Sequence, residues 1–197
     1  MAERIKTALE KALERAAQLK VSDSDLERLA RVDAGRALAG RFLQDPALDL
    51  LRELASQAPD ARHDVTAGVE EILLQNIALP VDEQVARTNR RAMEGITAIK
   101  RDPEAVRMIS GELGYLFDYY SQAYRHSYTN LKEHFEQRLG AARQMLEQQT
   151  GVRMRMNVER LPEFREEWIR TVGALNAQYE SLLKEQKERL KAIPLAF

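Results

Sequence analysis

Hydrophobic positions recur along most of the chain at three- and four-residue spacing, which is typical of one face of an α-helix. Charged residues fill the positions between them, as in residues 3–19 and 61–79. The 9 glycines and 6 prolines are few for a chain rich in turns or strands. We therefore predict an all-α protein, with helices over residues 3–19, 22–43, 46–57, 61–79, 85–101, 103–149 and 162–193.

Residues that favour helix ends support several of these boundaries. Ser22 is a predicted N-cap, and the pairs Asp45-Pro46 and Asp102-Pro103 each predict an N-cap followed by the first helical residue. No proline and no strong stop signal then interrupts the chain before Thr150-Gly151. The sequence thus predicts one very long helix in the second half.

An eleven-residue apolar repeat marks this long helix and the last helix of the chain. Such a repeat corresponds to about 3.67 residues per turn and keeps one stripe on one side of a nearly straight helix. Two helices with the same period are predicted to pair as an antiparallel, coiled-coil-like hairpin. The stripes are Leu113, Phe117, Tyr120, Tyr124, Tyr128, Leu131, Phe135, Leu139, Ala142 and Leu146, and Trp168, Val172, Leu175, Tyr179, Leu183, Gln186, Leu190 and Ile193.

The register of this hairpin follows from where the chain reverses. Reversal near Arg155 makes facing residue numbers sum to about 310, an alignment that brings the two stripes together. In this register the Gln186 side chain supplies a hydrogen-bond partner for the Tyr124 hydroxyl. The predicted pairs are Trp168 with Ala142, Val172 with Leu139, Leu175 with Phe135, Tyr179 with Leu131 and Gln186 with Tyr124.

A second apolar stripe lies off this seam near the start of the long helix. Because a helix that is apolar on several faces is usually surrounded, we expect the N-terminal helices to cover this stripe. The predicted organisation is a helical head, residues 1–101, packed on the start of a long hairpin, residues 102–197. The second stripe consists of Met108, Tyr115, Leu116, Tyr119 and Ala123.

Composition restricts the functional classes. The 30 basic and 31 acidic residues give a formal net charge of -1, so no global field favours nucleic acid or an anionic membrane. The chain has no cysteine, which excludes disulfides, thiolate metal sites and cysteine nucleophiles. Neither a signal peptide nor a transmembrane stretch of roughly twenty apolar residues is evident. These features predict a cytoplasmic protein that does not bind membranes.

The residue types suited to metal chemistry are scattered. His126 and His134 lie about 12 Å apart along a helix, too far for one ion without a third helix. Two Glu-x-x-Glu pairs on the last helix, residues 163 with 166 and 185 with 188, have a spacing used by helical magnesium-dependent hydrolases. A solvated helix surface explains both patterns more simply, and no metal or cofactor is predicted.

Two further surfaces have interaction chemistry. A face containing Arg87, Arg90, Arg91, Lys100, Arg101 and Arg107 suits phosphate, although Glu94 and Glu104 offset its charge. Between the two long helices, apolar residues alternate with polar ones, a pattern typical of an extended segment that docks on a partner. These predicted docking residues are Val152, Met154, Met156 and Val158.

No motif in the sequence specifies a reaction. We predict a non-enzymatic helical interaction or scaffold protein that acts through the hairpin, with a protein partner or a second copy in a homodimer. A helical metal-dependent hydrolase, or another enzyme using carboxylate or histidine ligands, is the alternative. A nucleic-acid-binding accessory protein using the arginine face ranks third.

Overall fold

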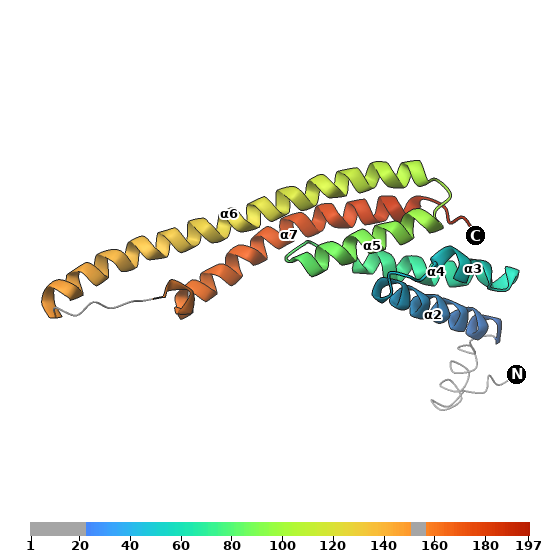
Figure 1. Cartoon of the computed structure of the whole chain (residues 1–197), viewed down its shortest axis with the longest axis horizontal. Helices are drawn as coiled ribbons and strands as arrows, with labels where there is room; N and C mark the ends of the chain where they lie inside the picture. Colours follow the sequence, from blue (N-terminus) through green and yellow to red (C-terminus); the bar gives the residue numbers. More distant parts are fainter. Residues whose placement is uncertain (1–22, 151–156) are drawn as a thin grey trace, which may run out of the picture. The chain divides into compact units, whose positions relative to one another are not determined.

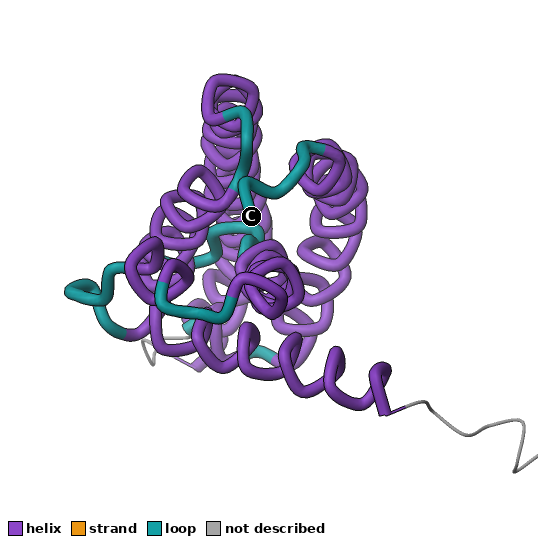
Figure 2. Tube along the Cα trace, turned by 90° about the vertical axis from the view of Figure 1, so that its right-hand side faces the viewer, coloured by secondary structure: helices purple, strands orange, loops and turns teal. Residues whose placement is uncertain are grey.

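The computed structural model describes residues 23–150 and 157–197. Helices joined by loops make up this part of the chain (Figure 2). Its only strand-like pairing is one antiparallel bridge between Lys100 and Leu195. The all-α prediction is confirmed. The elements are α2 (Asp23–Gln44), α3 (Leu50–Ala55), α4 (Pro59–Asn76), α5 (Glu83–Ile99), α6 (Pro103–Thr150), the 3-10 helix η1 (Val158–Arg160) and α7 (Pro162–Ala192).

Most predicted helix boundaries agree with the structure, with one clear correction. The Asp102 carboxylate accepts a hydrogen bond from the Ala105 amide at 3.0 Å and so caps α6, as predicted. The predicted cap at Asp45 is wrong: residues 45–48 form a turn, and α3 begins at Leu50 with Asp49 as its N-cap. The Asp45 side chain instead accepts from the Ala47 amide at 2.9 Å within this turn. Ser22 and the predicted helix 3–19 lie outside the described residues.

Two compact units divide the chain, and each is described by itself. One contains residues 23–72 and Phe197, and the other contains residues 73–196 apart from 151–156. The division predicted between residues 101 and 102 stays a prediction.

In the first unit, α2 and the first part of α4 pack in backbone contact. A Cβ placed on Gly35 would lie 2.0 Å from the Val65 carbonyl oxygen, and one on Gly68 would lie 2.0 Å from that of Val32. Only glycine allows this approach. Ion pairs such as Arg36 with Glu71, at 2.7 Å, flank the contact.

In the second unit, α5, α6 and α7 pack together, with α6 and α7 side by side over much of their length (Figure 1). Asp82 caps α5 by accepting from the Val85 amide at 2.8 Å. The buried Asn89 side chain bonds both the amide and the carbonyl of Ala78, at 2.9 and 2.7 Å, and so anchors α5 to the preceding loop. This unit contains the surfaces considered below.

Candidate functional site

Aromatic side chains form the contact between α6 and α7. The Trp168 ring lies between those of Tyr124 and Tyr128, with centroid distances of 5.0 and 5.1 Å and edge-to-face geometry. Phe164 packs similarly against Tyr128 and Phe135, at 5.9 and 5.5 Å. Edge-to-face pairs contribute about 0.5–1.5 kcal/mol each beyond area burial. The two helices therefore run antiparallel along an aromatic seam.

The predicted register of this seam is wrong. Phe135 faces Phe164 and Tyr120 faces Tyr179, pairs whose residue numbers sum to 299, so Trp168 does not face Ala142. The shift equals one eleven-residue repeat. Sliding one helix by a full repeat restores the same alignment of stripes, so the pattern alone does not distinguish the two registers.

The connection between the helices selects the observed register. Val158 is buried in a cluster with Phe135 and Phe164, and Glu159 bonds Tyr128. The residues just before α7 therefore lie beside the middle of α6. As a result α7 begins opposite Phe135 and not opposite the end of α6 at Thr150.

Hydroxyl groups in the seam have polar partners that the sequence analysis did not identify. The Tyr120 hydroxyl donates to the Asn176 side-chain oxygen at 2.9 Å, and burial raises the pKa of this phenol. Gln186 does not serve Tyr124 as predicted, because the observed register places Trp168 against Tyr124, and Gln186 instead accepts from Arg189 at 2.8 Å. The sequence did contain a signal for this partner: Asn176 lies on the seam side of α7, and a buried tyrosine hydroxyl needs a polar partner.

A second polar cluster joins α6 to η1. Glu159 accepts from the Lys132 ammonium and the Tyr128 hydroxyl, both at 2.8 Å. The Lys132 hydrogen bond, followed by that from Tyr128, lowers the pKa of Glu159, while Glu159 raises the pKa of both partners. These groups are partly exposed, so the cluster orients η1 more than it stabilises the fold.

Three residues of the second apolar stripe of α6 are exposed, contrary to prediction, whereas Leu116 and Ala123 are partly buried. Met108, Tyr115 and Tyr119 are 71%, 70% and 64% exposed. Within the second unit, α7 covers one side of α6 and α5 covers another, and the described residues of this unit leave a third side of the helix open. Large apolar side chains grouped on an open surface are typical of interaction sites.

This open surface continues onto α7. Glu112, on the same side of α6 as Met108 and Tyr115, accepts from Arg189 of α7 at 3.1 Å, and this bond lowers the pKa of the carboxyl. Leu182 lies seven residues before Arg189, on the same side of α7, and is 45% exposed. We call the surface formed by Met108, Gly111, Tyr115 and Tyr119, with Leu182 beside it, the open α6 face.

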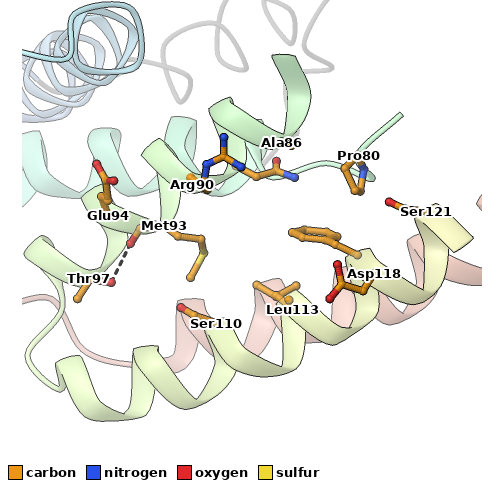
Figure 3. A pocket seen from close by; sticks show the side chains of 13 residues that line it. Pro80, Ala86, Arg90, Met93, Glu94, Thr97, Ser110, Leu113, Asp118 and Ser121 are labelled. Atoms are coloured by element: carbon orange, nitrogen blue, oxygen red, sulfur yellow. Dashed lines mark hydrogen bonds between the residues drawn. The ribbon is translucent and has the colours of Figure 1, made fainter. Parts of the chain in front are cut away.

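A groove lies between α5 and α6, on a side of α6 that adjoins the open α6 face at Asp118. Its volume is about 580 Å³, and the side chains of Met93 and Leu113 extend into it from the two helices (Figure 3). Arg90 and Glu94 line the α5 edge, and Asp118 lines the α6 edge. Within the described part of the chain, no cationic side chain pairs with Asp118.

The residues considered for metal chemistry are not brought together. His126 Nδ1 lies 3.1 Å from the Asn130 amide nitrogen, and the His134 ring contacts Phe135. Both Glu-x-x-Glu pairs, residues 163 with 166 and 185 with 188, are exposed on α7. Across residues 23–150 and 157–197, no three His, Asp or Glu side chains are placed to hold one metal ion.

The arginine face is divided among local ion pairs. Arg90 pairs with Glu83 at 3.0 Å, Arg91 pairs with Glu94 at 3.1 Å, and Arg107 pairs with Glu104. Arg87 also pairs with Glu83, at 4.0 Å, and the lysine of this face has a structural position.

Lys100 is buried, and its ammonium donates to the carbonyls of Lys191 and Ile193 at the end of α7. A cation bonded to the last carbonyls of a helix stabilises that end. The extended residues after α7 also pair with this region: the Ala196 amide donates to the Ile99 carbonyl at 2.8 Å, and the Arg101 amide donates to that of Pro194 at 2.9 Å.

The predicted docking segment is only partly described. Val158 is 5% exposed and packs in the cluster with Phe135 and Phe164. Val152, Met154 and Met156 lie outside the described residues. The docking role of this segment therefore stays a prediction.

The fold and these surfaces define an all-α protein with a long antiparallel helix pair and an open aromatic face. The chain belongs to a family of unknown function, DUF6657, whose model matches residues 51–192. This range contains the seam, the open α6 face and the groove. The comparisons with curated proteins and with solved structures each give no match. None of the described helices is long and apolar enough to cross a membrane.

Proposed function

We propose that this protein is a non-enzymatic helical scaffold that binds a protein partner through the α6–α7 pair. The observation that carries the proposal is the exposure of Met108, Tyr115 and Tyr119 on one side of α6. Tyrosine and methionine are enriched in protein interfaces because they offer large contact area and adaptable packing.

The open α6 face has the rigidity that a binding surface needs. The seam beneath it is held by aromatic pairs and by the hydrogen bond from Tyr120 to Asn176. The bond from Arg189 to Glu112 joins the two helices at the edge of the face. A partner therefore meets preorganised side chains and loses less entropy on binding.

A photo-cross-linking amino acid placed at Tyr115 tests this proposal in cells of the native host. We expect a discrete cross-linked product, because a partner seated on the open α6 face covers this position. The matched control carries the same amino acid at Glu188, which is exposed on α7. A pattern at residue 115 that equals the control, with no discrete product, contradicts the proposal.

The groove between α5 and α6 supports a second candidate function, the binding of a small amphipathic molecule. Its volume of about 580 Å³ falls within the range of small-molecule sites, and its floor is apolar. Fluorescence of anilinonaphthalene sulfonate provides a probe. We expect Ser110→Phe, which fills the groove, to abolish the signal, whereas Tyr115→Glu, on the open α6 face, leaves it unchanged. The opposite pattern assigns dye binding to the open face and contradicts this candidate.

A further inference from the structure

The open α6 face is self-complementary when the α6 helices of two copies run antiparallel. Arg107 and Asp118 lie along one edge of this face, eleven residues apart, and Met108 and Tyr119 lie along the other edge with the same separation. Eleven residues complete about three helical turns, so the members of each pair are aligned along the helix. Gly111 and Tyr115 occupy the centre between the two edges.

The pairs Arg107–Asp118, Met108–Tyr119 and Gly111–Tyr115 have nearly the same midpoint along the helix, at the level of residue 113. A two-fold axis at this level brings Arg107 of one copy to Asp118 of the other, and Met108 to Tyr119. It also places the Tyr115 ring over Gly111, where no described atom beyond the adjacent residues and the surrounding helix backbone lies within 4 Å of the position of a Cβ. Each contact occurs twice, as in any isologous interface.

The charges favour this antiparallel arrangement over a parallel one. In a parallel pair, two-fold symmetry places the edge with Arg107 and Asp118 opposite the edge with Met108 and Tyr119, so the opposite charges do not meet. In the antiparallel pair, Arg107 bridges Glu104 of its own chain and Asp118 of the second copy. Asp118 has no cationic partner within the described part of its own chain, so the second copy supplies one.

We propose that the partner on the open α6 face is a second copy of this chain, packed antiparallel with its two-fold axis at the level of residue 113. This inference rests on the proposed interaction function and specifies its partner. The apolar contacts of Met108, Tyr115 and Tyr119 supply most of the affinity, and the two Arg107–Asp118 pairs select the direction and the register.

Sedimentation equilibrium of the full chain over a range of concentrations tests this arrangement. We expect the wild type to dimerise, and we expect Asp118→Arg and Arg107→Asp each to weaken the dimer about tenfold or more, because each creates two like-charge contacts. Glu188→Arg, an equally exposed charge reversal on α7, is the matched control and should dimerise like the wild type.

Charge exchange provides the decisive step. Mixing the Asp118→Arg and Arg107→Asp chains restores two opposite-charge contacts between unlike copies, so the mixture should recover dimers of near wild-type affinity. The double variant R107D/D118R should recover the homodimer for the same reason. The two positions on one helix are about 16 Å apart, so rescue within a single chain is excluded.

Three outcomes overturn the inference: a wild type that is monomeric at all concentrations, a dimer insensitive to both reversals, or single variants that fail to recover on mixing. The cross-linking experiment separates this failure from that of the proposed function. A monomeric chain that still gives a discrete heterologous product at residue 115 retains its interaction function with another partner. A chain that neither dimerises nor gives a discrete cross-linked product at residue 115 contradicts both proposals.

Discussion

Tyr119 and Tyr120 are neighbours in the sequence of α6 but have opposite environments. Tyr120 is fully buried, packs edge-on against Tyr179 at 5.4 Å and bonds Asn176. Tyr119 is 64% exposed on the open α6 face. A rotation of about 100° per residue separates the two rings. The comparison teaches that the same residue type stabilises the fold on one side of α6 and remains available for a partner on the other.

Replacing each tyrosine by alanine tests this contrast with the largest expected effect. We expect Tyr120→Ala to lower the free energy of unfolding by about 4 kcal/mol, through the cavity left in the seam and the loss of the Asn176 hydrogen bond. We expect Tyr119→Ala to change it by less than about 0.5 kcal/mol. Urea denaturation of both variants, at a protein concentration low enough for the chain to be monomeric, provides the measurement, because dimerisation through the open α6 face adds to the unfolding free energy. Equal losses contradict the assignment of the two faces.

Disrupting the aromatic seam between α6 and α7 gives the next largest change in the free energy of unfolding. Trp168→Ala should cost about 3 kcal/mol, because its ring packs between Tyr124 and Tyr128. A double-mutant cycle of Trp168 with Tyr124 should show a coupling of about 1 kcal/mol. The pair Val172 and Leu139, which the alternative register brings together, should show none. A reversed result supports the register displaced by one repeat.

Removing only a tyrosine hydroxyl gives a smaller difference in unfolding free energy between the seam and the open α6 face. Tyr120→Phe leaves the Asn176 side-chain oxygen without its donor and should cost about 1 kcal/mol in urea denaturation. Tyr115→Phe, on the open α6 face, should be neutral within error. A neutral Tyr120→Phe indicates that water replaces the lost hydroxyl.

The pH dependence of the Glu159 cluster gives the smallest effect. Its hydrogen bonds from Lys132 and Tyr128 hold the pKa of Glu159 below the ordinary value of 4.5. The stabilisation is therefore present above pH 4.5 and is lost as pH falls through the lowered pKa.

Urea denaturation from pH 7 to pH 3 checks this sign. The difference in unfolding free energy between the wild type and Glu159→Gln should shrink as the solution becomes acidic. Glu163→Gln, on an exposed side chain of α7, is the matched control. A difference that grows toward low pH contradicts the role given to the cluster.

The sequence located the residues of the candidate site but not their environment. Met108, Tyr115 and Tyr119 stood out as an apolar stripe off the seam, since spacing alone places them on a separate side of α6. Their exposure depends on which neighbours cover that side. Spacing does not specify the neighbours, and the expectation of burial was wrong for this reason.

By itself, the sequence determined the all-α class, the length of α6 and the side of each long helix that forms the seam. These features follow from local propensities and from side-chain periodicity within one helix. Only the tertiary structure decided the register, because an eleven-residue repeat aligns equally well after a shift of one repeat. The buried position of Val158 beside Phe135 selects one of these alignments, and it depends on contacts between residues distant in the sequence.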